Sequence, residues 1–107
     1  MTSIKVSVLI STLNRPEKLM GCLRSLAQSK FKDFEVIVID QSDINRRFSD
    51  KNKPAQNNKF WRKVRVIHLD RKGLSLAHNW GIRQAKSDII AFTDDDCIVQ
   101  RDWLEKI

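Results

Sequence analysis

Three consecutive carboxylates follow an apolar run near the end of this sequence. Asp94, Asp95 and Asp96 follow Thr93 and the apolar residues 89–92, whose pattern is typical of a buried strand. Adjacent negative charges repel one another, and a chain keeps them together mainly where a cation, or a ligand that carries one, offsets the repulsion. The carboxyl end of a strand in an open α/β sheet faces the crevice where ligands bind. The triplet therefore predicts a metal site.

Three further strands and two helices are expected to accompany this strand. β-branched runs predict strands at residues 6–10, 35–40 and 64–69. A helix is expected after residues 11–14, with Asn14 as its N-cap, Pro16 in its first turn and Glu17 completing a capping box. A second helix should begin near Gly73. The apolar faces of the two helices are predicted to be, in order, Leu19, Cys22, Leu23 and Leu26, and Leu74, Ala77, Gly81, Ile82 and Ala85.

Alternating strands and helices predict an α/β fold, a three-layer sandwich with a mostly parallel, Rossmann-like sheet of about four strands. The length of 107 residues limits the chain to a single domain, 1–107, or to part of a larger one. Residues 41–62 are polar and poor in periodicity, so a flexible loop is expected there, with Phe60 and Trp61 anchoring its return.

Charge and cysteine content narrow the class of protein further. The net charge is +7, and residues 41–72 hold ten Lys or Arg against three Asp, which favours anionic partners. Cys22 and Cys97 lie within apolar patterns, so buried, reduced thiols are expected. No apolar stretch approaches the roughly 20 residues of a membrane span. We therefore expect a cytoplasmic chain, with membrane association left open for a longer protein.

Four polar segments should converge on one crevice, because the carboxyl ends of parallel strands share an edge of the sheet. Carboxylates and hydroxyls near Arg and His side chains suit a nucleoside diphosphate, since acids can bind a hard divalent cation that bridges to phosphate oxygens. A cation so placed stabilises a departing phosphate. The four segments are residues 11–14, 40–43, 70–73 and 93–96.

These segments resemble the ordered signatures of the family 2 glycosyltransferases. The resemblance is carried by residues 4–15, 34–40, 73–81 and 92–96 and covers nearly the whole chain. It implies the nucleotide-binding half of a GT-A domain, with strand order 3-2-1-4. It also implies a nucleotide-sugar donor, Mg²⁺ or Mn²⁺ as cofactor, and glycosyl transfer to a saccharide, lipid or protein acceptor.

The resemblance also assigns roles to individual residues. Asp94 and Asp96 match the outer acids of the DxD motif, which contacts the ribose and the metal on the diphosphate, and Asp95 is an alternative for either role. Asp40 matches the acid beside the base and ribose. The other residues expected to bind the nucleotide-sugar are Ser11, Thr12, Asn14, Arg15, Gln41, Gly73, His78 and Asn79.

Two departures from the family pattern concern the donor. Gln41 stands where the family commonly has a second acid, which leaves the choice of base open. His78 stands where many relatives have Arg, and a neutral imidazole would hold phosphate less firmly.

The chain ends about a dozen residues after the triplet, so the general base is expected beyond Ile107. We accordingly expect a donor-binding domain with little transferase activity of its own. Its fourth strand would form an exposed sheet edge, through which copies could associate.

Two other functions fit parts of the sequence. Asp94 and Asp96 after an apolar strand resemble the DxDx(T/V) motif of haloacid-dehalogenase-like phosphohydrolases, although that motif normally opens its domain. A basic module that binds nucleic acid through residues 46–72 is the other possibility. No nucleic-acid fold signature supports it, so no specific nucleic-acid partner is expected.

Overall fold

The computed structural model describes residues 4–53 and 59–107, and they form a four-stranded parallel sheet. The strands are β1 (Val6–Thr12), β2 (Phe34–Asp40), β3 (Val64–His68) and β4 (Ile90–Asp94). Their order is β3-β2-β1-β4, which confirms the expected topology. Ser11 pairs with Asp94 and Thr12 with Asp40, so these strands end level with one another.

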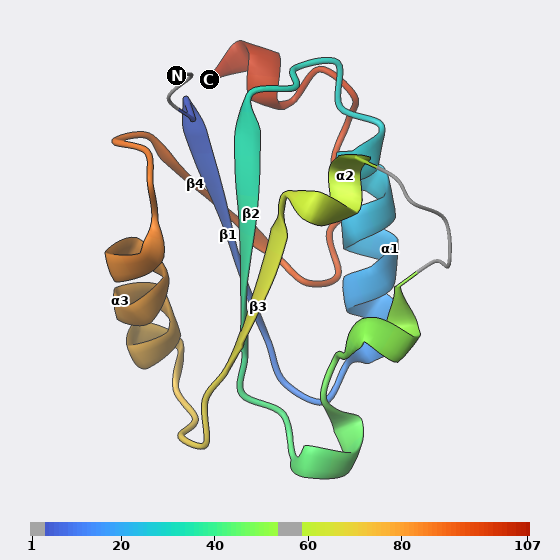
Figure 1. Cartoon of the computed structure of the whole chain (residues 1–107), viewed down its shortest axis with the longest axis vertical. Coiled ribbons are helices and arrows are strands. Elements are labelled where there is room, and N and C mark those ends of the chain that lie inside the picture. The colour runs from blue at the N-terminus through green and yellow to red at the C-terminus, as the bar shows by residue number, and fades with distance from the viewer. Residues whose placement is uncertain (1–3, 54–58) are drawn as a thin grey trace.

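Helices cover both faces of the sheet and produce the three expected layers (Figure 1). Helix α1 (Pro16–Ala27) packs through the four predicted residues Leu19, Cys22, Leu23 and Leu26, all buried. Helix α3 (Leu74–Gln84) lies on the opposite face. Alternate residues of β1 point to opposite layers, so that Val8 packs in the α1 layer and Leu9 in the α3 layer.

The buried face of α3 is narrower than the sequence pattern predicts. Ala77 and Gly81 are buried, but Leu74 and Ile82 are exposed. A Cβ atom at Gly81 would lie 1.6 Å from Leu9 Cδ2, so the missing side chain lets the helix backbone approach the sheet closely. Contact is thereby concentrated on a stripe of small residues, and the larger apolar residues beside it stay in solvent.

The turn between β1 and α1 differs from the predicted capping box. Arg15, not Asn14, occupies the N-cap position, and no side chain caps the helix. Asn14 has a left-handed backbone (φ 57°), and its side chain pairs with Asp43 instead, accepting a hydrogen bond from the Asp43 amide at 2.9 Å. Pro16 restricts Arg15, the residue before it, to an extended φ, so the helix cannot begin before Pro16. Asn14 therefore lies one residue before the N-cap position.

The segment predicted as a loop, residues 41–62, contains short helical pieces. They are the 3₁₀ turns η1 (Ile44–Arg46) and η2 (Asp50–Asn52) and the single-turn helix α2 (Lys59–Arg62); residues 54–58 lie outside the described part. Phe60 is buried, as the anchoring prediction requires, and Phe48 is a second buried anchor that the sequence pattern did not reveal. A third 3₁₀ turn, η3 (Leu104–Lys106), lies near the end of the chain.

Strand β4 is an edge of the sheet, as expected, and Phe92 on it is 46% exposed. Self-association through this edge remains a prediction. Among the described residues, no helix has the length and apolar character needed to cross a membrane.

Candidate functional site

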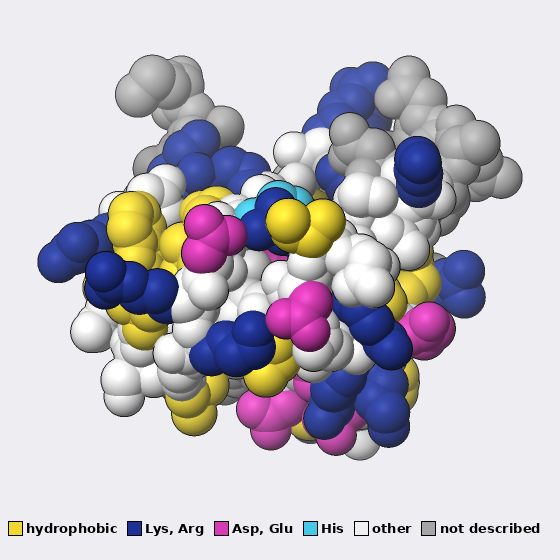
Figure 2. Space-filling view, turned by 90° about the horizontal axis from the view of Figure 1, so that it is seen from below, with side chains coloured by type: hydrophobic (Ala, Val, Ile, Leu, Met, Phe, Trp, Pro, Cys, Tyr) yellow, Lys and Arg dark blue, Asp and Glu magenta, His cyan; other side chains and the backbone are white. Residues whose placement is uncertain are grey.

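The carboxyl edge of the sheet brings together the loops that the sequence singled out. Figure 2 views the molecule from below, the side where β1 and β2 end in Figure 1, and shows acidic side chains interspersed with Lys and Arg. A cleft of about 490 Å³ opens here. It is lined by Ser11, Thr12, Leu13, Arg15, Gln41, Gly73, Leu74, Asp94, Asp95 and Asp96. Most of the predicted site residues therefore meet in one place.

The middle acid of the triplet points inward and is held by β1 and the start of α1. Asp95 is buried, and its Oδ2 accepts a hydrogen bond from Thr12 Oγ1 at 2.8 Å. Its other oxygen, Oδ1, lies 2.7 Å from the Arg15 guanidinium. Both carboxylate oxygens therefore have protein partners, which fixes the turn that follows β4.

The outer acids are exposed and could hold a cation. One ligand atom each from Asp94, Asp96 and Cys97 lie within 4.8 Å of one another. Two carboxylates provide the oxygen ligands that Mg²⁺ and Mn²⁺ prefer, whereas a thiol is too soft to suit Mg²⁺. The donor set thus fits a divalent metal, with the two acids as the predicted ligands.

The two cysteines differ in their surroundings. Cys97 is exposed, contrary to prediction, and its backbone amide closes the turn after β4 by donating to the Asp94 carbonyl at 3.2 Å. Only its adjacency to the acids could have marked it as part of the site. Cys22 is buried as predicted, and burial, reinforced by the charges of Cys97 and Asp95, raises the pKa of its thiol to about 12. The buried Cys22 thiol therefore stays protonated.

Gln41 joins three of the loops around the cleft. Its backbone amide donates to the Thr12 carbonyl at 3.0 Å, and its side-chain Nε2 donates to the Gly73 carbonyl at 2.9 Å. Gly73 has φ 134° and ψ 133°, a conformation that side-chain-bearing residues rarely adopt. The amide side chain is therefore fixed in orientation at the β2 side of the cleft.

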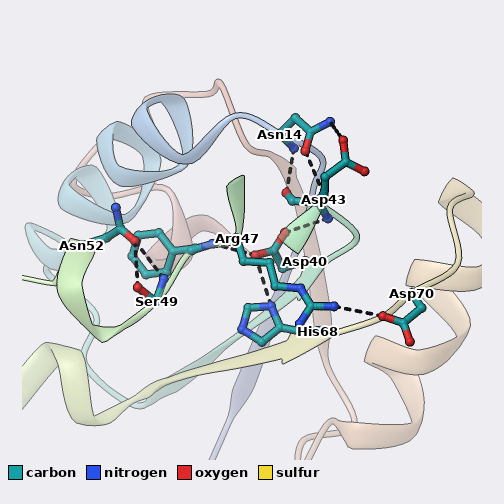
Figure 3. Close-up of polar contacts among 10 residues, drawn as sticks. Asn14, Asp40, Asp43, Arg47, Ser49, Asn52, His68 and Asp70 are labelled. Atoms are coloured by element: carbon teal, nitrogen blue, oxygen red, sulfur yellow. Dashed lines mark hydrogen bonds and ion pairs between the residues drawn. The ribbon is translucent and has the colours of Figure 1, made fainter. Parts of the chain in front are cut away.

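Asp40 ends β2 but does not line the cleft. Figure 3 shows its polar contacts. Asp40 is fully buried, and its Oδ1 accepts the Ser42 amide hydrogen bond at 3.0 Å. Its Oδ2 accepts the Phe48 amide hydrogen bond at 2.8 Å and lies 3.3 Å from His68 Nδ1. The carboxylate holds the segment after β2 against the sheet. His68, at the end of β3, belongs to this cluster.

Three other predicted residues lie away from the cleft lining. Asn14 spans the β1 and β2 loops through its contacts with Asp43, whose pKa is lowered by hydrogen bonds from Lys72 and Asn14. His78 packs against the Phe92 ring, 4.6 Å between centroids, and lines a neighbouring cleft of about 500 Å³. Asn79 is exposed and lines neither cleft.

Comparison with known sequences places these features in a family. The sequence model described as Glycosyl transferase family 2 matches residues 7–107. Glycosyltransferase AglE of Haloferax volcanii is 31% identical over 94% of the chain and 33% of its own length. Glycosyltransferase GlyG of Streptococcus pneumoniae is 28% identical over 95% of the chain and 33% of its own length. The chain spans about a third of the length of these two relatives and a smaller share of others, 14% in the case of Glycosyltransferase GlyA of Streptococcus pneumoniae.

Comparison with solved structures gives the same fold. S. aureus TarS is similar with a TM-score of 0.73 and 26% identity, over 95% of this chain and 30% of that one. A TarS complex with UDP-GlcNAc has a TM-score of 0.71 and 22% identity, over 95% and 29%. Mannosyltransferase PcManGT of Pyrobaculum calidifontis, in complex with GDP-Man and Mn²⁺, has a TM-score of 0.72 and 21% identity, over 97% and 31%.

Proposed function

The chain belongs to glycosyltransferase family 2 and has the sheet of a GT-A fold, and on this premise we propose that its cleft binds a nucleotide-diphospho-sugar through a divalent cation. The observation that carries the proposal is the pairing of Asp94 and Asp96. They are exposed at the wall of a cleft, with ligand atoms close enough to share one ion. A metal there would neutralise the diphosphate and stabilise it as the leaving group.

The three acids of the triplet are proposed to have two different roles, metal binding and positioning. Asp94 and Asp96 are proposed to hold Mg²⁺ or Mn²⁺. Asp95 is proposed to position them, because its two oxygens are already engaged by Thr12 and Arg15. This assigns the outer acids as ligands on the basis of the burial and partners of each carboxylate.

The base is proposed to lie at the β2 side of the cleft, against Gln41. Neighbouring strands are about 4.8 Å apart, so two strand spacings, about 10 Å, separate the end of β2 from the end of β4. That span suits a nucleotide whose diphosphate lies at the acids. With Nε2 bound to the Gly73 carbonyl, Gln41 Oε1, which accepts no hydrogen bond from the described residues, is proposed to accept an N–H of the base.

Complexes of structural relatives suggest which donors to test. TarS has been solved with UDP-GlcNAc, and PcManGT with GDP-Man and Mn²⁺. Because the chain spans a third or less of the length of its relatives, glycosyl transfer to an acceptor is proposed for the whole protein, with this chain as the donor-binding part. The acceptor and the general base are not assigned.

The two alternative functions are less well supported. The triplet follows the fourth strand of the chain, and the family match begins at residue 7. The acids therefore do not lie at the start of the domain, where the nucleophile of a haloacid-dehalogenase-like phosphohydrolase is expected. In the basic middle segment, Arg47 and Lys72 pair with Asp70 and Asp43. These ion pairs reduce the charge available to nucleic acid.

Calorimetric titration tests the proposal directly. UDP, GDP and CDP are titrated into the 107-residue chain with and without Mn²⁺. We expect binding of at least one diphosphate that depends on Mn²⁺ and weakens at least tenfold in Asp96→Asn. Asp88→Asn, which removes an exposed acid just before β4, is the matched control and should bind like the wild type. Binding that is equally strong without the metal would contradict the proposal.

A further inference from the structure

Arg15 links the buried and the exposed acids of the triplet. A single guanidinium nitrogen, Nη2, lies 2.7 Å from Asp95 Oδ1 and 3.1 Å from Asp96 Oδ2. Three adjacent carboxylates repel one another when they are ionised, and a guanidinium between two of them reduces this repulsion. Arg15 therefore supplies positive charge beside an acid that is also a candidate metal ligand.

A divalent cation and this guanidinium compete for Asp96. The cation would share Asp96 with Asp94, while Arg15 contacts the same carboxylate. Two cationic groups on one exposed carboxylate repel each other strongly at such short range. Occupation of the metal site is therefore expected to move the guanidinium off Asp96.

The surroundings of Arg15 would keep its guanidinium near the cleft after it leaves Asp96. Asp95 is buried and stays bound to Thr12, so it can keep the guanidinium at the cleft after Asp96 is lost. The Arg15 side chain is 42% exposed, which leaves it room to move. Its Nε atom is buried and, among the described residues, has no hydrogen-bond partner. Movement of the guanidinium off Asp96 would let this unpaired donor turn toward an anion in the cleft.

We propose that Arg15 is an exchangeable internal counter-ion: the metal displaces it from Asp96, and the released guanidinium then binds the donor's diphosphate. Guanidinium groups suit phosphate because their planar donors match its oxygens. This inference rests on the proposed function, since it assumes a metal and a diphosphate at this cleft. It adds a specific residue that couples the binding of the two.

Two affinities measured on Arg15→Gln test the exchange. The first is that of Mn²⁺ alone, followed by the electron-paramagnetic-resonance signal of the free ion. We expect it to rise about three- to tenfold, because the competing charge is gone. The second is that of GDP or UDP at saturating Mn²⁺, which should fall about tenfold, because a charge-assisted contact to the diphosphate is lost.

Matched variants separate the specific effect from net charge. Arg24→Gln makes the same charge change on an exposed residue in the last turn of the same helix, and it should leave both affinities near those of the wild type. Arg15→Lys keeps the charge but loses the planar donors, so it should retain the weaker Mn²⁺ binding while losing part of the nucleotide affinity. Circular dichroism checks that each variant is folded.

The outcomes test the exchange of Arg15 separately from the proposed binding of a nucleotide-sugar through a cation. Mn²⁺ affinity that is unchanged or lower in Arg15→Gln, with wild-type binding intact, would overturn the exchange and leave the proposed function standing. Unchanged nucleotide affinity would overturn the transfer to the diphosphate. A wild-type chain that binds neither Mn²⁺ nor any of the diphosphates would overturn the proposed function, and the inference with it.

Discussion

Asp40 and Asp96 lie at the same edge of one sheet, at the ends of β2 and β4, yet their surroundings are opposite. Asp40 is fully buried, and both of its oxygens accept backbone hydrogen bonds, from Ser42 and Phe48. Asp96 is exposed, and in the described part of the chain its carboxylate has one ion-pair partner, Arg15. The first carboxylate is saturated by the protein, whereas the second has capacity left for a ligand.

Under the proposed function, hydrogen-bond saturation is the property that separates structural acids from the proposed metal ligands. Glu35, near the start of β2, is a second saturated carboxylate. It is buried and receives hydrogen bonds from Ser7, Arg65 and the Lys86 amide. Removing a saturated acid should therefore lower stability, and removing an unsaturated one should lower binding.

The largest expected effect is that of Asp40→Asn on stability. The amide keeps the size of the side chain but turns one acceptor into a donor, which faces a buried N–H or the His68 ring. We expect the free energy of unfolding to fall by about 3 kcal/mol, measured by urea denaturation. Asp43→Asn, an exposed acid of the same loop, serves as the control. An equal fall in the free energy of unfolding in the two variants would show that Asp40 contributes no more to stability than an exposed acid.

Glu35→Gln should have a smaller, pH-dependent effect. Burial alone would raise the pKa of Glu35, but hydrogen bonds from Ser7, Lys86 and Arg65 outweigh it and lower the pKa. The folded state therefore favours the ionised form, and this stability is present above the pKa of the unfolded chain and is lost as the pH falls through the folded one. We expect Glu35→Gln to cost about 1.5 kcal/mol at pH 7 and progressively less below about pH 4.

The same denaturation series run from pH 7 to pH 3 checks this behaviour. The unfolding free energies of wild type and Glu35→Gln should converge as the pH falls. A difference that stays constant over that range would show that ionisation of Glu35 contributes nothing to the stability of the fold.

Asp96→Asn should have the smallest effect on stability. Loss of the exposed pair with Arg15 is offset by relief of repulsion within the triplet, so the free energy of unfolding should change by about 0.5 kcal/mol or less. Mn²⁺ should raise the melting temperature of the wild type and leave that of Asp96→Asn unchanged. A large loss of stability without metal would place Asp96 among the structural acids.

Much of the fold could be predicted because local patterns agree with the tertiary structure. β-branched runs predicted the four strands, and the spacing of Leu19, Cys22, Leu23 and Leu26 predicted the buried face of α1. The strand order came from the family resemblance. The exposure of Leu74 and Ile82 was not predictable, because it depends on how closely Gly81 brings α3 to the sheet.

The candidate site was predictable in its location but only partly in its details. The rule that strands of a parallel sheet end at one edge located the cleft around Thr12, Gln41 and the triplet. Which acid of the triplet points inward depends on Thr12 and Arg15, which are more than 75 residues away in sequence. The burial of Asp40 likewise depends on amides from a segment with no periodic pattern.

Paramagnetic broadening by Mn²⁺ tests the central claim, that the open acids bind the cation and the saturated one does not. Substoichiometric Mn²⁺ is added to the ¹⁵N-labelled chain, and amide resonances are followed by NMR. We predict that the resonances of Asp94, Asp96 and Cys97 broaden first, while that of Phe48, bound to Asp40, persists. Broadening that begins at Phe48 and spares the triplet would contradict the account.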